Sequence, residues 1–374
     1  MRFISKSYYC EGCGGIMEFS TASQSLKCPN CGIEVEIENN PQNIIEHKLD
    51  IHAIKKIKVE EKTSTSMECE GCGAIVEVEA TSTATTCPYC GSHYVLTQKQ
   101  MESIVPDGVI PFKIDKNSVE LIFKNWIKKR WLAPNVLRTL YQKDKLQGIY
   151  MPYWTFDART STRYTAMGGI NYTVEYKDSE GKKCTRIETR WYPTRGYIDY
   201  FFDDVLVRAS NKLSKTLLEW IEPYNTKNVS SYSPDYMSGY CSEVYTIDLQ
   251  EAHSEAMDKI RNDIYYMAER DVLRRYDRVS SIRLHTSYNN ETYKHIFIPV
   301  YSTAYIYKNE RYNVLINGET GKIKGEYPKS PIKIGLIIIL ILSILLGIYF
   351  ASSDENVSYN NEYEKSQYSQ LIDK

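Results

Sequence analysis

The sequence lacks the loops with which proteins hold nucleotides: neither GxxxxGK[ST] nor GxGxxG occurs among its 374 residues. Its six histidines have no ligand spacing, and we expect each of them to be structural. The carboxylates Asp157, Asp203 and Asp204 suggest acid–base chemistry, but no His, Ser or Cys partner stands at a recognisable spacing from them. We therefore expect no catalytic residues and no enzyme, and we keep an enzyme in the central region as a third alternative.

A long apolar run is also missing from the N-terminal residues MRFISKSYYCEG, so no signal peptide is expected there. Such a run is present near the other end, where residues 332–350 read IKIGLIIILILSILLGIYF. The uncharged part, from Ile334 to Phe350, makes a helix of about 25 Å, the lower limit for crossing a bilayer. A buried helix usually keeps a polar face, whereas only Ser343 interrupts these residues, so we expect one transmembrane helix.

The flanks of this helix predict its orientation. Four lysines lie within about fifteen residues before it: Lys322, Lys324, Lys329 and Lys333. The nearest charges after it are Asp354 and Glu355. By the positive-inside rule the large N-terminal part is expected in the cytoplasm and the polar tail, 351–374, outside the cell membrane and disordered.

Eight of the ten cysteines form two sets of paired CxxC motifs. The first set is Cys10, Cys13, Cys28 and Cys31, and the second is Cys69, Cys72, Cys87 and Cys90. Each cysteine of the second set follows its counterpart by 59 positions, and the neighbours repeat too, YYCEGCGG with MECEGCGA and LKCPNCG with TTCPYCG. This is an internal duplication, in which IMEFSTASQSLK and IVEVEATSTATT alternate as the strands of two ribbons would.

Four thiolates on two CxxC turns are typical of a structural zinc site, and we predict two Zn²⁺ ions, one in each ribbon. Because the ribbons have little apolar core, their folding should depend on the metal. Disulfides suit a cytoplasmic chain poorly, and Cys87-Pro88-Tyr89-Cys90 matches a redox motif without the surrounding βαβ unit. Iron could occupy the same four-sulfur site. Cys184 and Cys241 lie outside any pair and are expected to be buried thiols.

The composition shifts towards aromatic and basic residues after Pro106-Asp107-Gly108, where we place a domain boundary. A helix is predicted from Asp115 or Asn117, with apolar residues from Val119 to Ile127 at helical spacing, and a short one at 134–140. Four strands follow, GIYMPYWTFDA, RYTAMGGINYTVEY, KKCTRIETRWYP and RGYIDYFFDDVLV, with a hairpin turn at 178–181. A candidate binding patch lies in this region: Arg190, Trp191, Tyr192, Pro193 and Arg195.

The same order of elements then returns. A long helix at 249–276 precedes VSSIRLHTSY, a turn at Asn289-Asn290, YKHIFIPVYSTAYIYK, ERYNVLI, a turn at Asn317-Gly318, and GKIKGEY. IYMPYWTFDA and IFIPVYSTAY align without a gap and carry proline at the same place. Residues 107–208 and 248–328 could thus be two related halves, each a helix followed by an antiparallel meander, unless two strand-rich segments resemble each other by chance. Either way the class is α+β.

The sequence thus divides into a first ribbon at 1–38, a linker at 39–66 that could add a strand to one ribbon, a second ribbon at 67–100, an α+β domain at 107–330, the transmembrane helix at 332–350 and the tail at 351–374.

As a set, the paired ribbons and six further segments resemble a family of bacterial membrane proteins with transcription-factor-IIB-type zinc ribbons. The segments are GVIPFKI, KLQGIYMPYWTFDA, FDDVLVRAS, the EPY of 222–224, KHIFIPVYSTAYIY and NGETGKIKGEYPKSP. Names in this family sometimes invoke the primosomal replication-factor-Y helicase, whose nucleotide-binding motifs are missing here, as are the cyclin-like repeats of the transcription factor. The resemblance spans residues 1 to about 350. It implies membrane anchors for phage-shock-type envelope-stress proteins and their flotillin-like or virion-core-like neighbours.

Charge separates the remaining functional classes. Residues 1–106 hold nine Lys and Arg against fourteen Asp and Glu, whereas residues 107–330 hold thirty-four against twenty-eight. A protein that reads nucleic acid should present a basic stripe, and an acidic ribbon region repels phosphate. We therefore predict a membrane-tethered cytoplasmic adaptor that recruits protein partners, with nucleic-acid binding as the alternative and no small-molecule substrate indicated.

Overall fold

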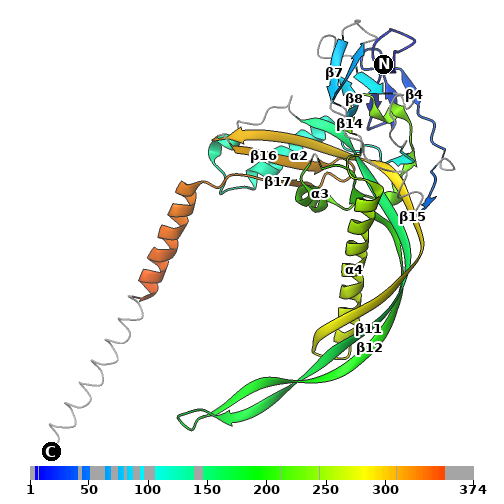
Figure 1. The fold of residues 1–374 in the computed structure, drawn as a ribbon. Helices are drawn as coiled ribbons and strands as arrows, with labels where there is room; N and C mark the ends of the chain where they lie inside the picture. Colours follow the sequence, from blue (N-terminus) through cyan, green and yellow to red (C-terminus); the bar gives the residue numbers. More distant parts are fainter. Residues whose placement is uncertain are drawn as a thin grey trace, which may run out of the picture.

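The computed structural model describes residues 5–6, 8–40, 44–50, 64–68, 75–79, 82–86, 93–96, 106–138, 146–211, 213–243, 245–308 and 310–349. It has a large curved sheet, a small three-stranded sheet near the N-terminus, and an apolar C-terminal helix that projects from the body (Figure 1). The predicted α+β class is confirmed.

The helical elements are α2 (Lys116–Lys128), η3 (Asn135–Arg138), α3 (Lys215–Ile221), η5 (Thr226–Asn228), η6 (Pro234–Met237), α4 (Leu249–Leu273) and the C-terminal helix (Pro331–Tyr349). The strands are β1 (Ser5–Lys6), β2 (Glu18–Ser20), β3 (Ser25–Lys27), β4 (Glu34–Glu36), β5 (His47–Lys48), β6 (Ser64–Glu68), β7 (Ile75–Glu79), β8 (Ser82–Thr86), β9 (His93–Leu96), β10 (Gly108–Val109), β11 (Gln147–Lys177), β12 (Lys183–Arg208), β13 (Ser230–Ser231), β14 (Cys241–Glu243), β15 (Arg278–Tyr307), β16 (Glu310–Asn317) and β17 (Ile323–Gly325).

The centre of the large sheet is the antiparallel pair β11 and β15. The aligned motifs IYMP and IFIP lie on these two strands and face each other, with Met151 opposite Ile298. Both side chains are fully buried, as are those of Trp154, Tyr150 and Tyr301 beside them. The two motifs that the sequence relates to each other thus form the middle of the core.

The four strands predicted between 148 and 207 are in fact two, because β11 and β12 run without interruption through 159–162 and 194. The polar residues Arg-Thr-Ser-Thr at 159–162 resemble a loop in sequence, but Thr160 and Thr162 are buried. Thr160 donates to the carbonyl of Tyr200 (3.0 Å), and the Thr162 hydroxyl bonds that of Thr286 (2.9 Å). The predicted turn at 178–181 is present, so β11 and β12 form one long hairpin rather than a meander.

The predicted turn at Asn289-Asn290 is also wrong, because β15 continues through it as an irregular strand. The register of β15 against β11 shifts there, between Asp157 and Arg159, and Asn290 has a φ of 52°. Asp157 fixes the shift: its carboxylate accepts from the backbone N–H of Asp204 (2.7 Å) and from the Thr292 hydroxyl (2.8 Å). Such bulges bend a sheet.

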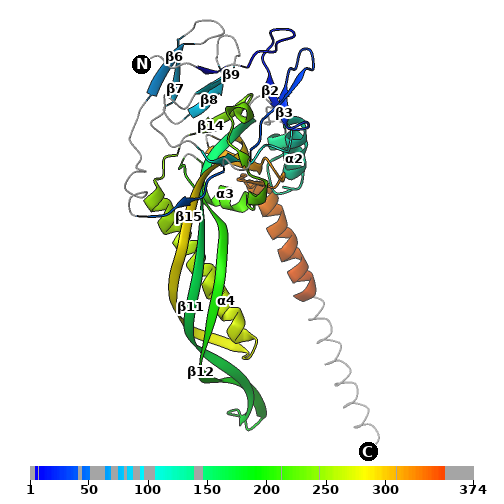
Figure 2. The same ribbon diagram turned by 90° about the vertical axis from the view of Figure 1, so that its right-hand side faces the viewer.

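Beyond these bulges, β11, β12 and β15 form a curved arm, made of residues 158–177, 183–202 and 278–290 (Figures 1 and 2). Helix α4, predicted as a long helix at 249–276, lies along its concave face. The side chains that face the sheet recur every fourth residue and are fully buried: Ala252, Ala256, Ile260, Ile264, Ala268 and Val272. The alanines allow close approach of helix and sheet.

Helix α2 covers the opposite end of the sheet. Its N-cap is Asp115, one of the two helix starts that the sequence predicts, and the Asp115 carboxylate accepts from the backbone N–H groups of Asn117 and Ser118. Phe123 and Trp126 pack with Val314 and Ile316 of β16. Helix α2 thus packs on a strand of the other predicted half, whereas α4 packs on β11 and β12 of the other half and on β15 of its own. An origin of the halves by duplication stays a prediction. The helix predicted at 134–140 is described as far as residue 138, where η3 lies, and its remainder also stays a prediction.

The strand predicted in the linker, at 44–61, is described only at 44–50, where β5 pairs with Thr292 and Tyr293 of β15 rather than with a ribbon strand. The last linker residues, 64–66, begin β6, which pairs with β7. His47 bonds Asp107 (2.7 Å), and Glu46 pairs with the buried Lys294 (3.1 Å). The linker is thus attached to the central domain by the outer edge of its core sheet.

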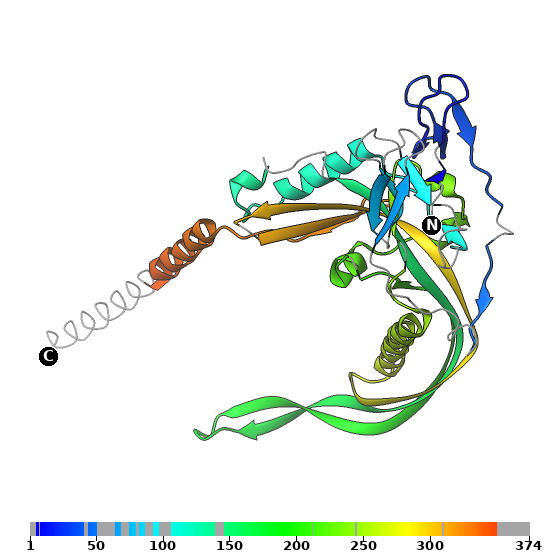
Figure 3. The ribbon, with the colours of Figure 1, turned by 45° about the horizontal axis from the view of Figure 1, so that its top comes forward.

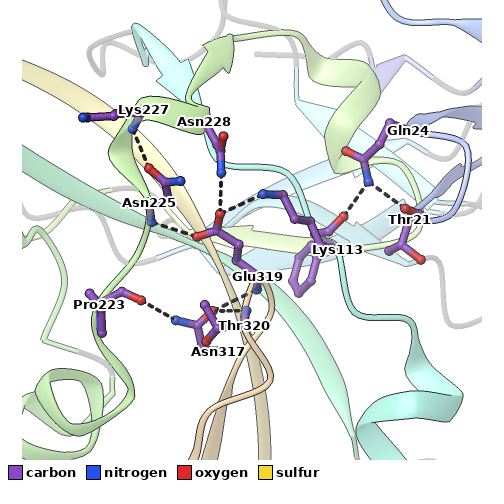
Figure 4. Close-up of polar contacts among 11 residues, drawn as sticks. Thr21, Gln24, Lys113, Pro223, Asn225, Lys227, Asn228, Asn317, Glu319 and Thr320 are labelled. Atoms are coloured by element: carbon purple, nitrogen blue, oxygen red, sulfur yellow. Dashed lines mark hydrogen bonds and ion pairs between the residues drawn. The ribbon is translucent and has the colours of Figure 1, made fainter.

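The turn after β16 joins several of the segments on which the family resemblance rests (Figure 4). Asn317 is fully buried, donates to the carbonyls of Ile221 (3.0 Å) and Pro223 (3.3 Å), and accepts from two backbone N–H groups of its own turn. Glu319 accepts from Lys113 (2.9 Å) and from the Asn225 backbone (2.9 Å). Burial alone would raise the pKa of Glu319, but these donors outweigh it and hold that pKa below its usual value.

We predict that Asn317→Ala destabilises the central domain by about 2–4 kcal/mol, because it leaves two carbonyls and two N–H groups without their partner in a buried place. The measurement is the urea midpoint of the detergent-solubilised chain, followed by tryptophan fluorescence. Asn289→Ala, at an exposed position of the arm, is the matched control and should leave the midpoint within about 0.5 kcal/mol of wild type. Equal midpoints for all three chains would contradict the prediction.

His295 is a second buried polar residue of the core. Its ring lies against Trp154 (centroids 4.8 Å apart) and Tyr245 (5.7 Å), and no described residue bonds either ring nitrogen. Burial lowers the pKa of His295 to about 3, so the imidazole is neutral in the folded chain.

His295 should make the domain sensitive to acid. An unfolded histidine titrates near pH 6.5, so between about 6.5 and 3 the unfolded chain binds a proton that the folded chain does not. Stability is then highest above about pH 6.5 and falls on acidification by up to about 1.4 kcal/mol per pH unit. His295→Phe should flatten this part of the curve of urea midpoint against pH, whereas His285→Phe, at an exposed position, should keep the wild-type slope. Identical slopes for wild type and His295→Phe would refute the assignment.

Candidate metal centre

The first set of cysteines comes together at one point of the N-terminal ribbon. The Sγ atoms of Cys10, Cys13, Cys28 and Cys31 all lie within 4.8 Å of one another. The closest approaches are 3.4 Å, between Cys10 and Cys31 and between Cys13 and Cys28. A disulfide needs about 2.05 Å, so the four thiols are free.

Two matching loops hold these thiols. The N–H of Gly14 donates to the carbonyl of Cys10 (2.8 Å), and the N–H of Gly32 donates in the same way to that of Cys28 (2.9 Å). Gly14 and Gly32 have φ angles of 71° and 80°, a backbone region that side chains other than glycine rarely adopt. The glycine after the second cysteine of each motif, which the sequence repeats, is thus what closes each loop.

The apolar core of this ribbon is small. Cys10 and Cys28 are buried with Met17 and Leu26, and the partly buried Tyr8 and Ile37 pack against them, while Cys13 and Cys31 are exposed. Backbone N–H groups, first that of Cys31 and then that of Asn30, lower the pKa of the Cys28 thiol to about 6 against the effect of burial. Such donors stabilise a thiolate, which is the form that binds a metal.

The arrangement fits a tetrahedral zinc ion. Zn–S bonds of about 2.3 Å place neighbouring sulfurs about 3.8 Å apart, within the range that these four Sγ atoms span. A bound metal would hold the two loops together and leave no coordination position open, so its role would be structural rather than catalytic. Iron bound by four thiolates would use the same residues.

The second set, Cys69, Cys72, Cys87 and Cys90, lies outside the described residues. The strands that flank it repeat those of the first ribbon in register. Glu68 pairs with Ile75 as Tyr9 pairs with Ile16, and Thr86 pairs with His93 as Lys27 pairs with Glu34. A second metal site therefore stays a prediction, supported by strand pairs at the same offset as the cysteines.

Both ribbons are attached to the central domain. In the first, Phe19 packs against the ring of Tyr236 (5.4 Å), and its N–H donates to the carbonyl of Ser238 (3.0 Å). Gln24 donates to the carbonyl of Phe112 (2.9 Å), next to the lysine that bonds Glu319 (Figure 4). Figure 3 shows this ribbon, in dark blue, at the end of the body away from the arm. Sequence reasoning missed Phe19 as a docking residue, although it alternates with the polar residues of its strand.

The segment predicted as the second ribbon is divided between two sheets. Its strands β8 and β9 belong to the large sheet, where β8 pairs with β14 and β9 with β1, at the start of the first ribbon. Its strands β6 and β7 pair with each other in a separate two-stranded sheet.

The candidate acid–base residues have structural partners. Asp157 is buried, and burial raises its pKa, but both of its oxygens accept hydrogen bonds that form the bulge. Asp204, with a φ of 53°, pairs with the buried Lys294 (2.8 Å). Asp203 is exposed. Cys184, on β12 near the turn at 178–181, and Cys241, the first residue of β14, are partly exposed rather than buried as expected.

The aromatic and basic residues at 190–195 do not form one patch, because they alternate between the two faces of β12. Trp191 and Arg195 share the convex face of the arm with Tyr197, while Arg190 lies over the ring of Tyr172 (5.2 Å) on the other face. Of the predicted patch, Trp191 and Arg195 therefore lie together on the convex face of the arm.

Comparison with known proteins gives one relative. The chain is 29% identical over 348 residues to a Bacillus subtilis (strain 168) protein named "Uncharacterized protein YdjG", and the similarity covers 92% of this chain and 96% of that protein. No family model and no solved structure matches the chain. The similarity therefore extends over most of both chains, under a name that assigns no activity.

We predict two zinc ions per chain, without iron in their place, and the loss of one of them in Cys28→Ser. Because the first ribbon has so small a core, this variant should unfold the ribbon and expose residues 8–38 to protease, while the second ribbon keeps its metal. Metal analysis of the purified chain and mass spectrometry of the protease fragments measure the two effects. Cys184→Ser, outside both sets, should retain both ions. A wild-type chain with fewer than two zinc ions would refute the paired sites.

Proposed function

We propose that this protein is a membrane-tethered adaptor, whose zinc ribbons and central domain recruit protein partners to the cell membrane. The observation that carries the proposal is the outer edge of the first ribbon. Within the described chain β4 pairs only with β3, so its other edge is open. Ile33, just before β4, and Val35, on it, are 43% and 48% exposed and alternate with Glu34 and Glu36.

An open strand edge with exposed apolar side chains suits the addition of a strand from another protein. The acidic residues beside it favour a protein partner over phosphate. The attachment of the ribbon to η6 supports this reading, because a rigid platform loses little conformational entropy when it binds. Residues Phe112 and Lys113 connect the platform to the core.

Membrane attachment would come from the helix Pro331–Tyr349, which is long and apolar enough to cross a bilayer. We propose that the lysines before it keep the ribbons in the cytoplasm. The resemblance to bacterial membrane anchors with transcription-factor-IIB-type ribbons supports partners from the envelope-stress response.

The test is affinity purification of the tagged full-length chain from the membranes of its own cells. We expect specific protein partners that are retained at about 0.2 M salt and reduced at least tenfold by Val35→Glu. The matched control is Ile187→Glu, at an apolar position of the arm that is 69% exposed, which should keep the partners. Both variants must bind as much zinc as wild type. Recovery of no partner, or of partners that Val35→Glu leaves unchanged, would refute the adaptor at this edge.

Nucleic-acid binding is the second candidate, and the convex face of the arm favours it. On this face Arg195 and Arg283 flank Thr165, and in the next row Tyr197 and His285 flank Arg163. The three arginines have no ion pair within the described residues. Arginines beside an exposed aromatic ring can neutralise phosphates and stack on bases. Nucleic acid that survives about 0.2 M salt in the purification, and is lost in Arg163→Glu, would favour this candidate.

A further inference from the structure

The first turn of the C-terminal helix is attached to the loop between α2 and η3. The Lys333 ammonium donates to the carbonyls of Trp131 (2.9 Å) and Ala133 (2.8 Å) and to the side chain of Asn135 (2.9 Å). The N–H of Ser330 donates to the carbonyl of Leu132 (2.8 Å). The loop therefore lies beside the first turn of the helix. A bilayer that contains the helix must come into contact with the loop.

Large apolar side chains are exposed in this region. Trp131 is 63% exposed, and Leu121, on α2, is 62% exposed. Tryptophan is enriched at the level of lipid headgroups, where its apolar ring and its N–H are both accommodated. In the folded chain nothing described covers the Trp131 ring, although its own backbone is held by Lys333.

Three lysines around Trp131 are available to an outside partner. Lys128 and Lys129 end α2, Lys329 precedes the apolar helix, and all three are exposed without an ion pair among the described residues. Arg130 differs from them, because its guanidinium lies over the rings of Trp126 (5.0 Å) and Tyr327 (5.4 Å) and is used inside the protein. Between residues 128 and 136, which the structure describes, the exposed charged side chains are therefore all lysines.

We propose that the end of α2 and the loop up to η3 form an interfacial foot that rests on an anionic lipid surface, with the Trp131 ring among the headgroups and Lys128, Lys129 and Lys329 paired with lipid phosphates. This inference rests on the proposed membrane attachment. The attachment of the loop to the first turn of the helix argues for lipid rather than for a soluble partner, since it fixes the foot beside the point of entry. Each lysine near an anionic leaflet should favour anionic lipid by about fivefold.

The foot can be tested with the full chain in nanodiscs of phosphatidylcholine and phosphatidylglycerol, one of the two lipids carrying bromine near the headgroup end of its chains. Bromine quenches tryptophan on contact. We expect quenching that disappears in Trp131→Phe and persists in Trp191→Phe, which removes an exposed tryptophan of the arm. Quenching should be stronger with brominated phosphatidylglycerol, and Lys128→Glu with Lys129→Glu should abolish this preference.

The outcomes separate the two proposals. A chain that does not enter nanodiscs at all refutes the membrane attachment and the foot with it. A chain that enters them, with quenching unchanged in Trp131→Phe, refutes the foot alone. Loss of quenching in Trp131→Phe without any preference for phosphatidylglycerol refutes the anionic surface.

Discussion

The antiparallel pairing of β11 with β15 is the constraint on which the other elements depend. It places Met151 against Ile298 in the core, and the other strands of the domain pair along the remaining edges of these two long strands. Strands β10, β5 and β16 pair along β15, and β12 and β14 pair along β11. Within the described residues, the first ribbon contacts the body through elements packed on this sheet, so a shift of register in the central pair would displace the candidate metal centre as well.

The polar residues that look most chemical in the sequence serve this same architecture. Asp157 holds the bulge that curves the arm, and Asn317 and Glu319 join segments that lie about a hundred positions apart in the chain. Buried polar groups that are fully bonded specify one arrangement of the chain and rigidify it. Surfaces that are available to partners lie elsewhere, on the edge of β4, on the convex face of the arm and around Trp131, where the side chains are exposed.

The sequence predicts local features here better than long-range ones. The cap at Asp115, the turn at 178–181, the loops of Cys10 and Cys28 and the apolar helix follow from spacing within a few residues, and the structure has all four. The sequence alone could not show that 159–162 continues a strand. The threonines there bond Tyr200 and Thr286, which are far away in the chain. The docking of Phe19 likewise depends on η6, and the position of η6 cannot be predicted from the sequence of the ribbon.

The distance along the chain between the central strands has a consequence for synthesis. The ribbon cysteines and the β11–β12 turn join near neighbours and can form early, whereas Ile149 must wait for Val300 before the core can close. Pairings between such distant residues form slowly. By the time β15 is available, the apolar helix at 331–349 is the next helix to be made. On the proposed membrane attachment, completion of the domain and delivery of its anchor to the bilayer are thus adjacent events, and an interruption between them would leave the unpaired edges of the long hairpin beside the membrane.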